Sequence, residues 1–168
     1  MPYYVDSMPS FSDPVIDFGF NYEYYAPVVL DLDGDGIELM RQEQSNAYFD
    51  VKGSGFKYHV GWVGADDGLL AIDLNGDGKI DQAKELSFAL WTTDPKDTDM
   101  QGLAAVFDTN HDGVLNKADT QFASFRIWQD KNGNGVTDAG ELRTLADMGI
   151  DSVGLTAKDA SWASGGNK

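Results

Sequence analysis

The sequence contains no cysteine, which excludes a disulfide framework and every cysteine-based zinc site. It has only two histidines, too few for a histidine zinc site. Twelve Lys and Arg stand against 28 Asp and Glu, and the formal net charge of -16 makes the chain a poor match for nucleic acid. No stretch approaches the roughly 18 consecutive apolar residues that a membrane-spanning helix needs. The first 14 residues also lack the basic and apolar regions of a signal peptide.

The composition is nevertheless that of a folded protein. Hydrophobic residues make up 42% of the chain and aromatic residues 12%, which separates it from acidic disordered tails. Its 168 residues correspond to one domain or at most two small ones. The acidity has two ordinary explanations, solubility alone or clusters of carboxylates that bind cations. The positions of the acids along the chain separate these two explanations.

Changes in composition divide the chain into three parts. Residues 1–26 are aromatic and acidic, are interrupted by prolines, and show no helical or strand period, so we expect an extended leader. Residues 27–160 form the candidate domain. Residues 161–168 are small and polar, and we expect a flexible tail there.

For residues 27–160 we predict an α+β fold. In the N-terminal half, β-branched and apolar runs indicate short strands, and two aromatic runs around a glycine-rich turn indicate a hairpin. In the C-terminal half, the pattern favours helix-loop-helix units like those of EF-hands. The expected strands cover 27–30 and 69–72, the hairpin covers 47–64, and the expected helical segments cover 103–107, 119–125 and 141–148, the last capped by Gly149.

Acidic loops rich in Asn and Gly carry the chemistry. Ca²⁺ is a hard cation that takes about six to eight oxygen ligands. An EF-hand loop supplies them from side chains at positions 1, 3 and 5, a carbonyl at 7, a group at 9 and an acid at 12. Glycine at position 6 allows the sharp turn. Four segments of this chain follow that spacing in whole or in part, so we predict Ca²⁺ as the cofactor.

The two C-terminal loops fit best. The fourth loop, 130–141, offers Asp130, Asn132, Asn134, the Val136 carbonyl, Asp138 and Glu141, with Gly135 at the turn. The third loop, 108–119, offers Asp108, Asn110, Asp112, the Val114 carbonyl, Asn116 and Asp119. Aspartate is shorter than glutamate at position 12, so the third loop is expected to bind more weakly.

The two N-terminal loops depart from the pattern. The second loop, 73–85, offers Asp73, Asn75, Asp77, the Lys79 carbonyl and Asp81, and its closing acid, Glu85, comes one residue late. The first loop begins with Asp31, Asp33 and Asp35, but Gln42 occupies position 12. It needs a further oxygen, for which Glu38 and the Asp66–Asp67 pair are candidates. A fifth segment, at Asp50, is degenerate because Lys52 stands where a ligand belongs.

Several such loops in one chain indicate a calcium switch. One copy can arise by chance, because Asp, Asn and Gly favour tight turns anyway. Like charges about 4 Å apart repel by about 4 kcal/mol at an effective dielectric of 20, so each empty loop crowds its carboxylates at a cost. We therefore expect a loose chain at cytosolic calcium and a compact one at millimolar calcium.

Longer motifs carry a family resemblance. The segments 27–38 (PVVLDLDGDGIE), 61–70 (GWVGADDGLL), 73–78 (DLNGDG), 125–135 (FRIWQDKNGNG) and 140–150 (GELRTLADMGI) come in this order. Together they resemble the self-processing module of iron-regulated (Frp-type) RTX proteins, over about residues 27–158. The resemblance implies type I secretion, to the medium or cell surface, without an N-terminal signal peptide. It also implies calcium-triggered autocatalytic cleavage of an Asp-Pro bond before the first loop, followed by isopeptide ligation to a lysine of another protein.

This chain departs from the family where the cut is expected. Ala26 stands before Pro27 in place of the Asp nucleophile, so we predict no cleavage at this bond. Either the chain is a natural member that does not process, or Asp was replaced to retain the precursor; the presence of residues 1–26 favours the second. A calcium-stabilised binding or spacer module of a secreted adhesin or toxin remains the alternative. We expect a monomer.

Overall fold

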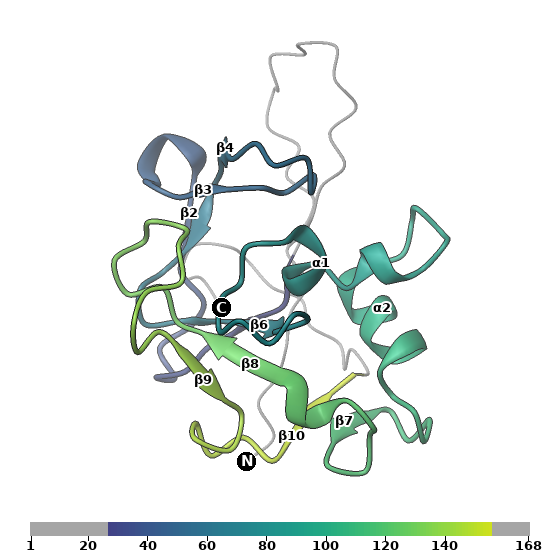
Figure 1. Ribbon diagram of the computed structural model, residues 1–168. Coiled ribbons are helices and arrows are strands. Elements are labelled where there is room, and N and C mark those ends of the chain that lie inside the picture. The colour runs from purple at the N-terminus through teal and green to yellow at the C-terminus, as the bar shows by residue number, and fades with distance from the viewer. Residues whose placement is uncertain (1–26, 156–168) are drawn as a thin grey trace.

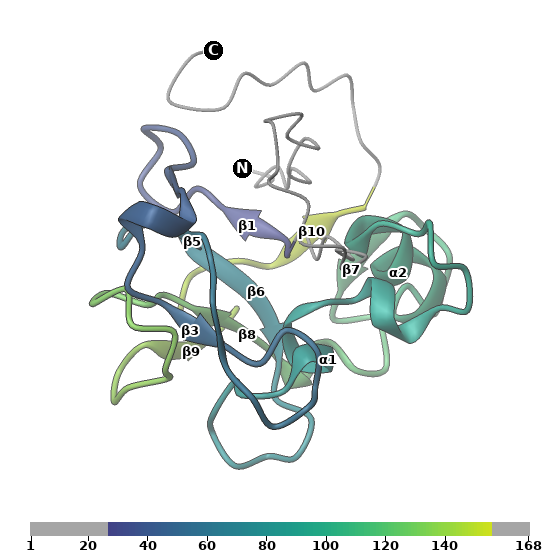
Figure 2. The same ribbon diagram turned by 90° about the horizontal axis from the view of Figure 1, so that it is seen from above.

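The computed structural model describes residues 27–155. The predictions for the leader 1–26, including Ala26, and for the tail 161–168 lie outside these residues. A four-stranded antiparallel sheet with the order β1-β6-β8-β9 organises the fold. Figure 1 shows β6, β8 and β9 side by side, and Figure 2 shows β1 beside β6. The strands are β1 (Val29–Leu30), β6 (Gly68–Ile72), β8 (Phe125–Trp128) and β9 (Leu142–Thr144).

Both faces of this sheet are covered, which explains why β6 is apolar at every position. Successive side chains of a strand point to opposite faces. Leu70 and Ile72 accordingly pack in one hydrophobic cluster, and Leu69 and Ala71 pack in the other. All five residues of β6 are buried. The strand predicted over 69–72 is therefore the centre of the core.

Smaller two-stranded sheets and helices form the two covers. On one side, the first cluster joins the sheet to α2 (Asp99–Val106) and to the paired strands β7 (Val114–Asn116) and β10 (Ser152–Gly154). On the other side, the second cluster joins it to the β3–β4 hairpin, to β5 and to α1 (Ala83–Leu86). Figures 1 and 2 both show α2 and β7 far from β3. The remaining strands are β2 (Leu39–Met40), β3 (Tyr48–Phe49), β4 (Tyr58–His59) and β5 (Trp62–Val63), paired β2 with β5 and β3 with β4.

The prediction of an α+β fold with helix-loop-helix units in the C-terminal half is wrong. Residues 27–155 form mostly strands and loops, with two α-helices, α1 and α2. Three further turns are 3₁₀-helical: η1 (Gln42–Gln44), η2 (Ala89–Trp91) and η3 (Phe122–Ser124). No helix in this part of the chain has the length and apolar character needed to cross a bilayer.

Strand pairing explains the error. The segment 141–148 has apolar residues at a helical spacing, but its first half forms β9, which pairs with β8 through Leu142 and Trp128. The segment 119–125 holds only the single turn η3 before β8 begins. The third loop therefore lies between α2 and the turn η3 and contains β7, and the fourth loop lies between two strands. Long-range pairing overrides local helical preference here.

Candidate metal centre

Strand order decides where the loops meet. The first loop follows β1, the Asp66–Asp67 turn precedes β6, and the fourth loop follows β8. Because neighbouring strands are antiparallel, all three lie at one end of the sheet. Gln129 Nε2 donates to the Asp66 carbonyl at 3.2 Å across this end. The second loop leaves the other end of β6, yet Ile80 N donates to Thr137 Oγ1 at 2.9 Å and so joins the second loop to the fourth.

The first acid of each loop binds the backbone of the turn that follows it. In the fourth loop, Asp130 Oδ2 accepts from Gly135 N at 2.8 Å, and Oδ1 accepts from Gly133 N at 2.9 Å. Trp62 Nε1 also donates to Asp130 Oδ2, at 2.7 Å. Asp130 is completely buried. The amide at position 6 reaches the first acid in the other loops too: Gly113 to Asp108, Gly78 to Asp73 and Gly36 to Asp31.

The closing acids of three loops bind two backbone amides of their own loop in the same way. Glu141 accepts from Lys131 N at 3.0 Å and from Asp138 N at 2.9 Å, which are positions 2 and 9 of the fourth loop. Asp119 and Glu85 bind the same two positions of their loops. The distances are 2.7 and 2.9 Å for Thr109 N and Asn116 N to Asp119, and 3.2 and 3.0 Å for Leu74 N and Asp81 N to Glu85.

Glu85 thus closes a loop that is one residue longer than the others. It is fully buried, and burial raises its pKa despite the amides of Asp81, Gln82 and Leu74. Burial also acts to raise the pKa of Asp119, but hydrogen bonds from Asn116 and Thr109 outweigh it and lower that pKa. Glu85 and Asp119 thus occupy equivalent positions in their loops, but the pKa of Glu85 is raised and that of Asp119 is lowered.

Positions 3, 5 and 7 are linked in the same way in the second, third and fourth loops. The side chain at position 3 accepts from the amide of position 5, and the side chain at position 5 accepts from the amide of position 7. These side-chain-to-backbone bonds form successive Asx turns in each loop. The bonds join Asn75, Asp77 and Lys79; Asn110, Asp112 and Val114; and Asn132, Asn134 and Val136. Asp138, at position 9, accepts from both Asn132 and Asn134, which lowers its pKa.

The degenerate segment at Asp50 shows which of these contacts also occurs in a turn without the EF-hand pattern. Asp50 accepts from Ser54 N at 3.0 Å and from Gly55 N, as the first acid of a loop does. Its Lys52, at position 3, instead extends over the Tyr58 ring, 5.2 Å from the centroid. The turn at the first acid is thus a local backbone feature, whereas the closing acid distinguishes the second, third and fourth loops.

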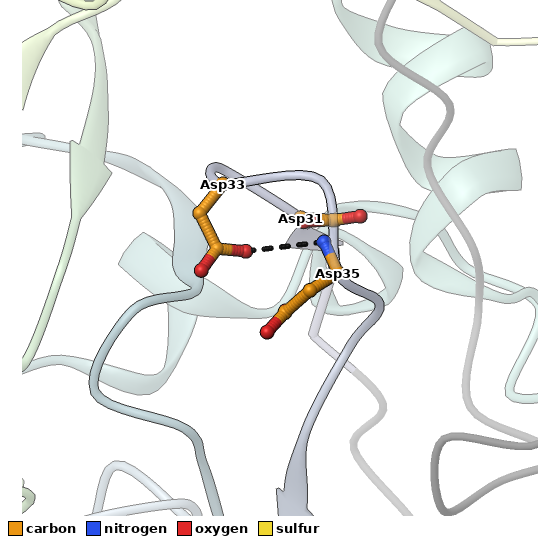
Figure 3. A group of neighbouring side chains, drawn as sticks. All are labelled: Asp31, Asp33 and Asp35. Carbon is orange, nitrogen blue, oxygen red and sulfur yellow. Dashed lines mark hydrogen bonds between the residues drawn. The ribbon is translucent and has the colours of Figure 1, made fainter.

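The first loop gathers acids without a closing acid of its own. Asp31, Asp33 and Asp35 each offer an oxygen within 4.8 Å of the others. Figure 3 shows them around one turn, with Asp35 N donating to Asp33 at 3.3 Å. A side-chain hydrogen bond with Asp33, together with the negative charge of Asp33, raises the pKa of Asp35. Such crowding of carboxylates is what a bound cation relieves.

A second acidic group lies next to it. Glu38, Asp66 and Asp67 also place oxygens within 4.8 Å of one another. Asp67 Oδ2 accepts from Glu38 N at 2.7 Å. Burial raises the pKa of Asp67 to about 7 against the opposing Glu38 amide, and the charges of Glu38, Asp31 and Asp66 add to the rise. Burial also raises the pKa of Glu38.

The donor set fits a hard cation. Every side-chain atom predicted to bind the ion in the loops is a carboxylate or amide oxygen, which are the ligands that Ca²⁺ takes. Four carboxylate oxygens among the described residues are buried without a hydrogen-bond partner: those on Glu38, Asp67 and Asp73 lie in the acidic groups or loops, and that on Asp99 lies outside them. Sequence reasoning missed the bond from Trp62 to Asp130, because no sequence pattern links residues 68 positions apart.

Comparison with known proteins places these loops in a family. The SPM domain matches residues 28–168 of the chain. The iron-regulated protein FrpA of Neisseria meningitidis serogroup C is 43% identical over 143 residues, which cover 83% of this chain and 13% of the relative. The chain thus spans a small part of the relative's length, and the identity supports the Frp-type relation. The chain belongs to the SPM domain family.

Proposed function

We propose that this chain is a calcium-binding module whose fold depends on Ca²⁺. One observation carries the proposal: Glu85, Asp119 and Glu141 each accept from positions 2 and 9 of their own loop. The same contact thus recurs in three loops of different sequence. In each loop the two acids, the side chains at positions 3 and 5 and the carbonyl at position 7 would hold the ion.

We further propose that the module is built for calcium-triggered cleavage before Pro27, with Asp at position 26. That carboxylate would attack its own main-chain carbonyl carbon and form a five-membered cyclic anhydride. The C–N bond to Pro27 would break, and the proline nitrogen would take a proton and leave as a secondary amine. Water or a lysine amine of another protein would then open the anhydride, and a lysine would form an isopeptide bond.

The residues after this bond support a coupling to the first loop. Val28 is completely buried, and its carbonyl accepts from Leu70 N at 2.9 Å. Val29 pairs with Leu69 in the sheet. The leaving side of the bond is therefore held by the core, and the first loop begins four residues after Pro27. A calcium ion that orders this loop would raise the population of chains in the attack geometry.

The test restores the nucleophile. Ala26→Asp, incubated with millimolar Ca²⁺, should yield a new fragment that begins at Pro27, detected by intact mass. The parent chain with calcium and Ala26→Asp with chelator are the controls, and neither should be cut. An uncut Ala26→Asp chain that is folded and loaded with calcium would remove the self-processing proposal and leave calcium binding in place.

Ala26 itself favours a second function for the chain as it stands. Alanine carries no nucleophile, so this chain would act as a calcium-stabilised binding or spacer module that does not cut. The Frp-type relation supports secretion by a type I route, with folding delayed until the chain meets external calcium. Monomeric chains in calcium would fit either function.

A further inference from the structure

Three carboxylates outside the loop pattern meet at the start of β6. Glu38 comes from the segment after the first loop, and Asp66 and Asp67 come from the turn before β6. Each offers an oxygen within 4.8 Å of the other two. Antiparallel pairing of β1 with β6 brings the two segments together, because the end of β1 lies beside the start of β6. The first-loop acids form a separate group.

Buried oxygens without partners point to a ligand in this group. Asp67 is completely buried; its Oδ2 accepts from Glu38 N, while its Oδ1 has no partner among the described residues. Glu38 Oε2 is also buried and lacks a partner there. The ion pair within residues 27–155 joins Lys117 to Asp151, so no described basic side chain neutralises the three acids. Buried polar atoms are normally hydrogen-bonded, and buried charges are normally paired or bound to metal.

We propose that Glu38, Asp66 and Asp67 bind a Ca²⁺ ion of their own, separate from the ions of the loops, and do not complete the first loop. The donors are all carboxylate oxygens, which suit a hard divalent cation. Gly64 leaves room for them, because a Cβ there would lie 2.9 Å from Glu38 Cβ and 3.1 Å from Asp66 Oδ1. The inference rests on the proposed function only for the choice of calcium.

A cation in this site would connect the two ends of the first loop to one strand. Val29 and Leu30 pair with β6 before the loop, and Glu38 would be tied to the start of β6 after it. The site would therefore restrain the segment that follows Pro27.

The test counts calcium ions on the full chain by native mass spectrometry, with affinities from calorimetric titration of CaCl₂. Asp67→Asn keeps an oxygen for the Glu38 amide but removes the charge, and it should bind one ion fewer than the parent. Gly64→Ala should lose the same ion or weaken it at least tenfold. Asp99→Asn changes a buried Asp outside the acidic groups and should keep every ion. Asp33→Ala removes a ligating side chain of the first loop and should lose a different ion, so Asp33→Ala combined with Asp67→Asn should lose two.

Each outcome decides the proposal. Full calcium loading of Asp67→Asn, with affinities within twofold of the parent, would overturn it. Loss of only one ion in the double variant would also overturn it, because the two acidic groups would then share a cation. Near-UV circular dichroism reports folding; if Asp67→Asn does not fold, full loading of Gly64→Ala contradicts the site. A parent chain that binds no calcium would contradict the proposed function itself. If Glu141→Gln loses an ion but Asp67→Asn does not, only the inference is contradicted.

Discussion

At the scale of single residues, the closing carboxylates explain how the short loops that contain them are shaped. Each accepts from an amide near the start of its loop and from one near the end. The loop backbone is therefore drawn around the carboxylate, as a cation site requires. Glu85 does this from one residue later than Glu141, because a longer loop brings it back to the same two amides.

Asp99 is a buried acid that takes no part in the loops, and it should make stability depend on pH. It is 2% exposed and accepts from Ser87 Oγ at 2.9 Å and from Ala89 N at 2.6 Å. Burial raises its pKa to about 6. The stability that comes from its bound proton is fully present below about pH 4, the unfolded pKa, and is lost as pH rises through about 6.

We therefore expect Asp99→Asn to raise the free energy of unfolding relative to the parent at pH 8, by on the order of 2 kcal/mol. This gain over the parent should shrink as pH falls from 6 to 4, because both proteins then carry a neutral side chain. Denaturant unfolding at saturating calcium measures it. A difference that stays constant from pH 4 to pH 8 would show that the charge of Asp99 is not the cause.

At the scale of elements, the sequence indicates strands better than helices. The run 69–72 and the hairpin between 47 and 64 are present, because alternation and turn residues are local signals. The prediction of a helix over 141–148 is wrong: Leu142 and Leu145 have the spacing of one helix face, but only Leu142 lies in a strand, β9. The pairing of β9 with β8, which no local pattern in the sequence indicates, determines the structure of this segment. For the same reason, loop spacing located the acids, but nothing in it placed Trp62 against Asp130.

The fourth loop is docked onto the β3–β4 hairpin through its glycine at position 6. Gly135 has φ of 70°, and a Cβ there would lie 2.9 Å from both Tyr48 N and Tyr48 O. Tyr48 N donates to the Asn134 carbonyl at 3.4 Å in the same contact. Gly133 has a similar φ of 67°, but its Cβ would meet only Met40 Cε, at 3.9 Å.

These two glycines separate backbone strain from docking. Gly133→Ala should cost about 1–2 kcal/mol, the usual cost of left-handed backbone for a residue with a side chain. Gly135→Ala should cost a further 1–3 kcal/mol or so, because its methyl group displaces β3. Thermal unfolding in saturating calcium compares them. Equal losses for the two variants would mean that the hairpin does not pack against the loop as described.

At the scale of the whole molecule, the proposed calcium ions would offset the negative charge of the chain. The formal net charge of -16 includes acids concentrated in the loops and at the start of β6, so the empty chain repels itself. Calcium at 100 times the dissociation constant adds about 2.7 kcal/mol for each site. Three or four such sites approach the whole stability of an ordinary domain, about 5–15 kcal/mol. Folding and calcium binding should therefore be one equilibrium.

Circular dichroism of the chain at millimolar Ca²⁺ and with excess chelator tests that coupling most directly. The near-UV signal reports the packing of the buried tryptophans Trp62 and Trp128. It should be strong with calcium, collapse when chelator is added, and return when calcium is restored. The same near-UV signal and unfolding temperature in both conditions would contradict a calcium-dependent fold.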